Sequence, residues 1–165
     1  MDYIYIGTII STHGIKGELK IKSNFEYKDK VFIKGFNLYL GENKTKEIIN
    51  TYRYHKIYDM VTFEGYNNIN EVLKYLKQKV YIKREDLNIE KDYVLDDLIN
   101  LKVYEQDEYL GTIKDIYDNN GNTLLECIKD NKSFYIPYNS NFIKNVDTKS
   151  GKIIVSNAKD LILWK

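Results

Sequence analysis

The chain has 165 residues, of which 43% are hydrophobic and 14% aromatic, so it can form a packed core and is not a disordered protein. Lysine and arginine number 25 against 24 aspartate and glutamate, a net charge of +1. This balance argues against a protein that binds nucleic acid mainly through its phosphates, because such domains are usually strongly basic. Residues 1–90 carry a net charge of +3 and residues 91–165 one of −2, which gives mild support for an RNA-facing N-terminal half.

Alternation of apolar and polar residues, many of them β-branched or aromatic, predicts strands along the first half of the chain. They are expected at residues 3–11, 18–22, 36–40, 46–54, 57–63 and 80–83. One short helix is expected from Asn68, because Ile69, Val72 and Leu76 share one helical face. Asn68 with Glu71 three residues on resembles a capping box.

The segment between the first two predicted strands is the short motif that most suggests a functional site. It reads Thr12-His13-Gly14-Ile15-Lys16-Gly17, and its two glycines suit a tight turn that needs positive φ. The residues alone leave two interpretations open. His13 and Lys16 are either solvated turn residues, or they form an exposed tip where an imidazole and a cation contact RNA phosphate or a protein partner.

Residues 85–92 are mostly charged or polar, and strand signals resume after them. The later strands are expected at residues 101–105, 109–117, 123–129, 133–137 and 152–156. Strands at this short spacing, without long crossover helices, predict a small barrel in each half. We therefore expect an all-β chain with one or two short helices, made of an N-terminal barrel (1–86), a linker (87–94) and a second barrel (95–165).

Groups that could perform catalysis do not cluster in the sequence. His13 and His55 are far apart and lack metal-ligand spacing with another His or Cys, and no phosphate-binding loop motif occurs. Asp96 and Asp97 are adjacent, so their side chains diverge, and a capping role is expected for one of them. Cys127, the only cysteine, stands in an apolar run and is expected to be a buried strand residue. We expect a non-enzymatic protein with no cofactor and no metal.

Tyrosines offer a second candidate for binding. Asp92-Tyr93-Val94 follows the linker, and a tyrosine there is either a packing residue or an interface anchor. Tyr52, Tyr54 and Tyr58 are expected to contribute to the faces of neighbouring strands rather than to a base-stacking platform. The N-terminus lacks the pattern of a signal peptide and no apolar run is long enough to span a bilayer, so a cytoplasmic location without membrane contact is expected.

Several segments together resemble the RimM family of ribosome maturation factors along nearly the whole chain. Residues 6–21 are similar to its N-terminal signature, and the helix at about Asn68 followed by residues 80–84 resembles the end of its first domain. Residues 97–99 and 110–116 resemble the start of its second domain, a PRC barrel, and residues 135–137, 146–147 and 153–155 resemble the closing strands of that domain.

The resemblance implies an N-terminal barrel similar to those of translation factors and flavin reductases, joined to a PRC-type barrel. It also implies binding to the immature small ribosomal subunit, assembly of the subunit head, processing of its rRNA, and contact with the small-subunit ribosomal protein numbered nineteen. A monomer with possible rRNA contacts is expected. The ribosome-binding candidates are His13, Gly14, Lys16, Gly17, Tyr93 and Val94, on one surface that runs from the loop to the junction.

Three positions depart from the family pattern. The family usually carries two adjacent tyrosines, associated with ribosome binding, where this chain has Tyr93 and Val94. Asn100 replaces a usual glycine, and asparagine tolerates positive φ better than most residues. Near Lys77 and Gln78 a glycine that often ends the helix is missing.

Two rival functions stay open at this point. One is a small flavin- or nucleotide-using reductase built on the N-terminal barrel, which a flavin absorbance band in the purified protein would support. The other is a PRC-type adaptor for a non-ribosomal partner, which a pull-down lacking ribosomal proteins would favour.

Overall fold

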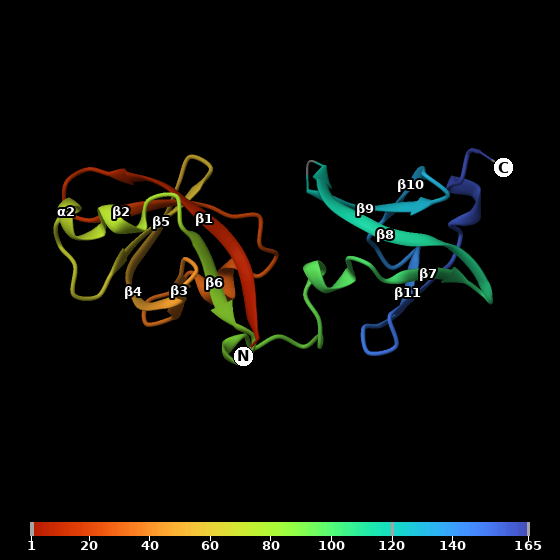
Figure 1. The fold of residues 1–165 in the computed structure, drawn as a ribbon, viewed down its shortest axis with the longest axis horizontal. Helices are drawn as coiled ribbons and strands as arrows, with labels where there is room; N and C mark the ends of the chain where they lie inside the picture. The colour runs from red at the N-terminus through yellow and green to blue at the C-terminus, as the bar shows by residue number, and fades with distance from the viewer. Residues whose placement is uncertain (1, 120, 165) are drawn as a thin grey trace. The chain divides into compact units, whose positions relative to one another are not determined.

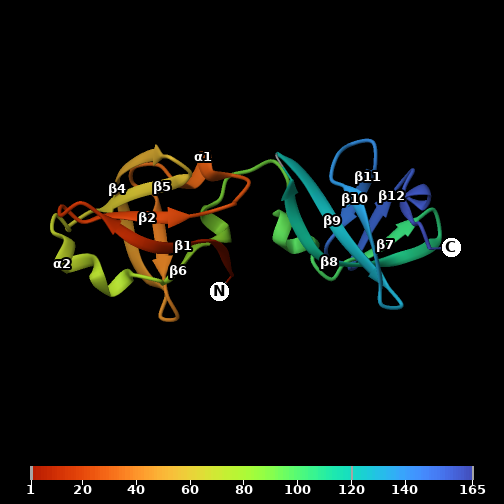
Figure 2. The ribbon, with the colours of Figure 1, turned by 90° about the horizontal axis from the view of Figure 1, so that it is seen from above.

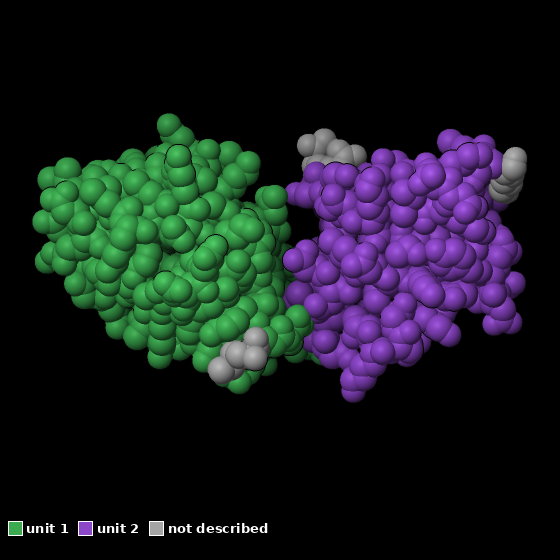
Figure 3. Space-filling view, viewed as in Figure 1, with its two compact units in different colours: residues 1–90 green, residues 91–165 purple. Residues whose placement is uncertain are grey.

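The computed structural model describes residues 2–119 and 121–164, and the chain divides into two compact units, residues 1–90 and 91–165. Figure 3 colours unit 1 and unit 2 separately. The segment predicted as the linker, residues 87–94, spans this division. The 3-10 turn η2 (Arg84–Asp86) precedes the segment and η3 (Leu95–Leu98) begins directly after it.

Unit 1 is a closed six-stranded barrel in the order β1-β2-β5-β4-β3-β6 (Figure 1). Figure 2 shows β1, β2 and β5 side by side, in agreement with their antiparallel pairing. The bounds of the strands are β1 Tyr3–His13, β2 Glu18–Lys22, β3 Asn37–Leu40, β4 Thr45–His55, β5 Tyr58–Phe63 and β6 Lys79–Lys83. All six lie within two residues of the predicted ranges.

The barrel interior is filled by the alternate residues of its strands, as the sequence pattern predicts. Ile4 and Ile6 of β1, Ile82 of β6 and Leu38 of β3 are between 0 and 4% exposed. Gly7 interrupts the alternation at a bulge in β1, where a Cβ would meet Lys22 O of β2 at 2.6 Å. Only glycine allows the two backbones to approach so closely there.

The predicted helix is present as α2 (Ile69–Val72), continued by the 3-10 turn η1 (Leu73–Tyr75). Asn68 Oδ1 accepts a hydrogen bond from Asn70 N at 2.8 Å, whereas Glu71 Oε1 accepts from Asn67 N at 3.2 Å. Both side chains cap free amides, but Glu71 reaches one residue further back than a capping box requires. A second helix, α1 (Lys28–Val31), is too short to show a helical period in the sequence.

Unit 2 contains a six-stranded sheet in the order β10-β9-β8-β7-β12-β11. All neighbours pair antiparallel except β12 and β7, which are parallel. The bounds of the strands are β7 Lys102–Glu105, β8 Glu108–Asn119, β9 Asn122–Lys129, β10 Lys132–Pro137, β11 Ile143–Asp147 and β12 Lys152–Val155. A last 3-10 turn, η4 (Lys159–Leu161), follows β12.

Strand β11 is the one strand of unit 2 that hydrophobic alternation did not predict. A bulge between Ile143 and Asn145 shifts its register against β12, so its two apolar residues, Ile143 and Val146, do not alternate with period two. Only the family resemblance pointed to a strand at Val146 and Asp147.

One side of the unit 2 sheet covers a core that includes Ile113, Leu125, Cys127 and Ile136, each 0% exposed. Burial of Cys127 is therefore confirmed. Asp97 Oδ2 accepts a hydrogen bond from Val94 N at 2.8 Å, so the expected capping role of this aspartate pair is confirmed at η3.

Two departures from the family pattern are explained by the backbone. Asn100 adopts φ 74, so asparagine takes the left-handed conformation in place of the usual glycine, as expected. Lys77, two residues after the end of η1, adopts φ 66, so a lysine stands in a conformation that favours glycine.

The fold class, all-β with two small barrel-type domains and short helices, is confirmed. Within the described ranges, no helix has the length and apolar character needed to cross a membrane.

Candidate binding surfaces

The loop at residues 13–17 joins β1 to β2 and is held in a defined conformation. Gly14 and Gly17 adopt φ 71 and φ 93, as the predicted tight turn requires. Ile69 N at the start of α2 donates to Ile15 O at 2.9 Å, and a Cβ on Gly17 would lie 3.4 Å from Asn68 N. The loop is thus anchored on the N-terminal end of α2, while His13, Gly14, Ile15 and Lys16 are exposed.

A second hairpin tip lies beside this loop. The β4–β5 turn approaches the loop at His55, the last residue of β4. The rings of His13 and His55 are 5.7 Å apart between centroids. Ile15 and Ile57, one from each tip, are 76% and 63% exposed. We call His13, Ile15, Lys16, His55, Lys56 and Ile57 the loop-end surface.

Electrostatics at the loop-end surface are dominated by cations. Burial lowers the pKa of His55 below its usual value, and the nearby charges of Arg53 and Lys56 lower it further. Glu18 is paired with Arg53 through two hydrogen bonds of 2.8 and 2.9 Å, which hold the pKa of that carboxyl below its usual range. Because Arg53 neutralises Glu18, the loop-end surface offers exposed cations and two exposed apolar side chains to a partner.

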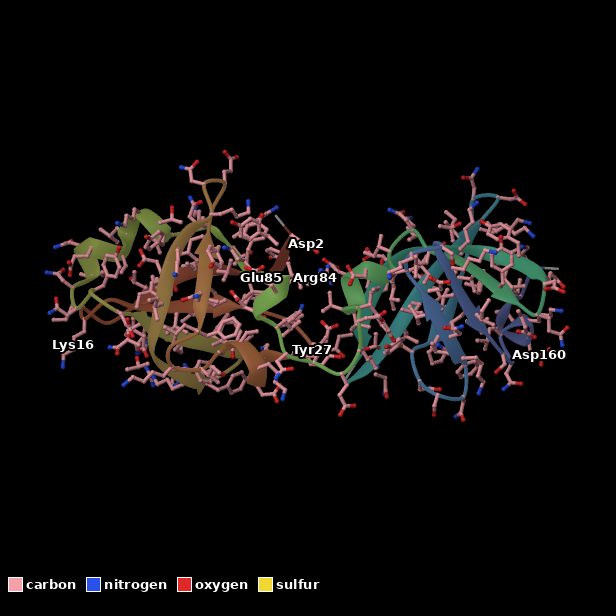
Figure 4. The ribbon with its side chains drawn as sticks, turned by 90° about the horizontal axis from the view of Figure 1, so that it is seen from below. Asp2, Lys16, Tyr27, Arg84, Glu85 and Asp160 are labelled. Atoms are coloured by element: carbon pink, nitrogen blue, oxygen red, sulfur yellow. The ribbon has the colours of Figure 1, made fainter. Side chains whose placement is uncertain are left out.

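The loop-end surface lies at one end of unit 1. Strand β1 starts at Tyr3, opposite Lys83, and ends at His13, so the loop follows the far end of this strand. Figure 4 shows Lys16 at one end of unit 1, and Asp2, Arg84 and Glu85 at the other, where the chain leaves the barrel. The loop belongs to unit 1 and Tyr93 to unit 2, so each is a candidate surface of its own unit.

Tyr93 in unit 2 belongs to a small polar aromatic cluster with Tyr138 and Lys91. The phenol oxygens of Tyr93 and Tyr138 are 2.6 Å apart, and Lys91 Nζ donates to the Tyr138 oxygen at 3.1 Å. Burial and the hydrogen bond with Tyr138 raise the pKa of Tyr93 to about 12. The ring of Tyr93 is half-buried, so it can present an edge to a partner while its hydroxyl stays fixed.

Val94 differs sharply from its neighbour. It is 2% exposed, so its side chain is buried and offers almost no surface to a partner. The six candidates thus divide into a loop group on unit 1, one half-buried tyrosine on unit 2, and one buried valine.

Sequence reasoning missed the contributions of Ile15, His55 and Ile57. His55 approaches His13 only in the folded barrel, and no local sequence pattern reports that contact. Tyr52 packs against Phe32 with centroids 5.7 Å apart and donates to Asp59 at 2.6 Å, in line with a packing role. Tyr54 is 59% exposed.

The described residues contain few groups that could form a metal site. Over residues 2–119 and 121–164, no group of three or more His, Cys, Asp or Glu side chains is placed to hold a metal ion. The features that do cluster are cations, exposed apolar side chains and tyrosines. They define a class of protein: a two-unit β chain whose clustered side chains are candidates for binding surfaces.

Comparison with known proteins identifies the family. Residues 4–87 match the model of the RimM N-terminal domain, and residues 95–161 match that of the RimM PRC barrel domain. The chain belongs to the RimM family.

Curated relatives match over nearly the full length of both chains. A ribosome maturation factor RimM of Finegoldia magna is 38% identical over 157 residues, covering 94% of this chain and 96% of its own. One from an Exiguobacterium species is 32% identical and covers 98% of each chain. The solution structure of the N-terminal domain of RimM from Thermus thermophilus covers 55% of this chain and 100% of its own, at 16% identity and a TM-score of 0.47.

Proposed function

We propose that this chain is a ribosome maturation factor that binds the immature small ribosomal subunit, assists assembly of its head, and supports processing of its rRNA. The observation that carries the proposal is the full-length match to relatives that are named ribosome maturation factors. We further propose that the small-subunit ribosomal protein numbered nineteen is a direct partner, and that the chain acts as a cytoplasmic monomer without cofactor or catalysis.

Binding energy alone can drive such an assembly step. A factor that binds one arrangement of RNA and protein more tightly than its alternatives raises the population of that arrangement by mass action. Release follows when later contacts of the maturing subunit replace those of the factor.

The two candidate surfaces suit different parts of this task. Exposed Lys16 and Lys56 at the loop-end surface suit RNA phosphates, and their contribution falls as salt rises. Exposed Ile15 and Ile57 add apolar area that suits a protein contact. Tyr93, held by Tyr138, suits a rigid anchor at a protein interface, because little rotamer freedom is lost when such a ring is bound.

The test is binding of purified full-length chain to immature small subunits. We expect Tyr93→Ala, and separately Lys16→Gln combined with His13→Gln, to weaken binding by at least about fivefold, the loss typical of an interface residue worth 1 kcal/mol. Lys114→Gln, which removes an exposed lysine of unit 2, is the matched control and should bind as the wild type does.

The outcomes separate function from site. If the wild type itself does not bind immature subunits, the proposed function fails. If the wild type binds and both altered chains bind equally well, the function stands and the assignment of these two surfaces fails.

A further inference from the structure

A second concentration of tyrosines and lysines lies on the outer face of unit 1, away from the residues of the loop-end surface. Strands β1, β6 and β3 are consecutive in the barrel (Figure 1). Their register puts Tyr5 opposite Tyr81, and Tyr81 opposite Tyr39, so a row of three tyrosines crosses the three strands. Tyr3, two residues before Tyr5 on β1, lies on the same face and opposite Lys83.

The four rings form a continuous aromatic layer. Ring centroids are 5.4 Å apart for Tyr3 and Tyr39, 6.5 Å for Tyr3 and Tyr81, and 6.0 Å for Tyr5 and Tyr81, all in edge-to-face geometry. Tyr39 is 5% exposed and forms the floor of the layer, whereas Tyr5 is 44% exposed. Tyr39 is itself buried in the core, whereas Tyr3, Tyr5 and Tyr81 lie outside the set of buried residues that fills the barrel.

Lysine ammonium groups stand over these rings. Lys44 Nζ is 4.2 Å from the Tyr81 centroid and 5.6 Å from that of Tyr3, Lys79 Nζ is 5.8 Å from Tyr5, and Lys83 Nζ is 5.1 Å from Tyr39. We call Tyr3, Tyr5, Tyr39, Tyr81, Lys44, Lys79 and Lys83 the tyrosine–lysine face.

The strand positions of this face carry charge of one sign, and the nearest acid acting on Lys83 is Glu85, beyond the end of β6. An ordinary solvated strand face mixes acidic and basic residues. Here the positions of β1, β6 and β3 that share this side of the sheet are occupied by Tyr3, Tyr5, Lys79, Tyr81, Lys83, Asn37 and the buried Tyr39, a set without a carboxylate. Asp2, at the end of β1, is paired with Arg84.

We propose that the tyrosine–lysine face binds single-stranded RNA. Aromatic rings accept any base by stacking, and lysines beside them neutralise the phosphates that connect the bases. The bases would stack on the exposed parts of Tyr5 and Tyr81. Lys44, Lys79 and Lys83 would turn from the rings to the phosphates, a motion that flexible side chains at a surface allow.

This site differs from the loop-end surface and from Tyr93. That the natural ligand is an unpaired stretch of small-subunit rRNA rests on the proposed function. RNA binding by the purified chain does not, because it is measured without ribosomes.

The experiment is fluorescence anisotropy of a labelled twelve-residue oligouridylate titrated with full-length chain. We expect saturable binding that is weakened about tenfold by Tyr5→Leu or Tyr81→Leu, since stacking of one base is typically worth that much or more. Replacing Lys79 and Lys83 together by Gln should weaken it further at low salt. Three phosphate contacts predict a slope of about −2 in log affinity against log salt concentration.

Tyr135→Leu is the matched control, because Tyr135 of unit 2 is 47% exposed, much like Tyr5. It should bind the oligonucleotide as the wild type does. Thermal melting followed by circular dichroism establishes that each altered chain is folded before its affinity is compared.

Three binding results would overturn the proposal, and a competition result would do so as well. They are no saturable binding by the wild type, equal affinity of the wild type and the Tyr5 and Tyr81 variants, or equal loss in Tyr135→Leu. Competition by oligoglutamate as strong as that by unlabelled oligouridylate would also overturn it, because the face would then recognise acidic protein segments. None of these results bears on whether the chain binds immature subunits.

Discussion

Unit 1 and unit 2 each contain six strands, yet their sheets are completed in different ways. In unit 1, β6 pairs with both β1 and β3, so the backbone ladder returns on itself. In unit 2, β10 and β11 stand at the two ends of the strand order, and the segment after β12 packs on the core. Trp164 of this segment packs on Phe134, with ring centroids 5.5 Å apart.

The buried hydrogen bonds and ion pairs of the two units differ as well. In unit 1 the fully buried Asp59 receives a hydrogen bond from Tyr52, and Lys28 Nζ lies 2.8 Å from its other oxygen, an ion pair without hydrogen-bond geometry. In unit 2, Glu105 Oε1 accepts from Ala158 N at 2.8 Å and Lys159 N at 3.2 Å, which ties the terminal segment to β7. Unit 1 is therefore expected to depend on an internal charge pair, and unit 2 on the docking of its terminal segment.

The largest expected effect concerns the thiol of unit 2. Burial, and the nearby charge of Glu126, raise the pKa of Cys127 from 9.0 to about 12. The thiolate fraction at neutral pH is therefore about a thousandfold lower in the folded state. We expect iodoacetamide to alkylate Cys127 only when unit 2 opens, and mass spectrometry of timed samples measures this rate.

The sign of the pH dependence follows from the same shift. Because the folded-state pKa is raised, this contribution to stability is fully present below pH 9 and is lost as the pH rises towards about 12. Protein unfolded in urea is the control and should react at the rate of a free thiol. Native protein that reacts equally fast would contradict the burial of Cys127.

The next largest effect is expected in unit 1 for Lys28→Met. Asp59 is 0% exposed, and removal of its cation leaves a buried carboxylate without charge compensation, which should cost about 3 kcal/mol in the free energy of unfolding. Urea denaturation followed by circular dichroism measures the change. The control adds Asp59→Asn, which removes the charge and should recover more than half of the loss. A loss below about 0.5 kcal/mol in the single variant, the size of an ordinary surface change, would count against the pair.

Trp164→Ala tests the terminal segment of unit 2. Loss of a half-buried aromatic ring should lower the stability of unit 2 by about 2 kcal/mol, less than for a fully buried ring. Alkylation of Cys127 should then become about thirtyfold faster, because opening becomes more favourable by that amount. Trp164→Phe keeps a ring against Phe134 and should lie near the wild type. An unchanged alkylation rate in Trp164→Ala would contradict the expectation that unit 2 depends on the docking of its terminal segment.

The smallest effect, and the only stabilising one, is expected for Lys77→Gly in unit 1. Lys77 is exposed and adopts φ 66, so glycine should relieve about 1 kcal/mol of backbone strain. Lys30→Gly inside α1 is the control, because it also replaces an exposed lysine by glycine, and it should lower stability. Urea denaturation compares the two, and a loss of stability in Lys77→Gly would contradict the strain.

The strands were largely predictable because each half-buried strand carries its own period of two, as Tyr3, Ile4, Tyr5 and Ile6 illustrate. Strand β11 was not, since a bulge removes that period. Turns were also predictable where they need a residue that tolerates positive φ, as at Gly14 and Asn100.

The candidate surfaces were only partly predictable. His13 and Lys16 were found because two glycines mark the loop, but His55 approaches His13 only in the folded barrel. Burial of Val94 could not be predicted from a motif at a junction. The tyrosine–lysine face combines β1 with β6, whose paired residues are about eighty positions apart in the sequence, and local patterns carry no information about such a pairing.

The measurement that tests the proposed function most directly is the distribution of the tagged full-length chain across a sucrose gradient of cell lysate. Enrichment with free small subunits, and absence from joined ribosomes, is the result that a maturation factor predicts. Chain that stays at the top of the gradient even at low salt, where phosphate contacts are strongest, would contradict it.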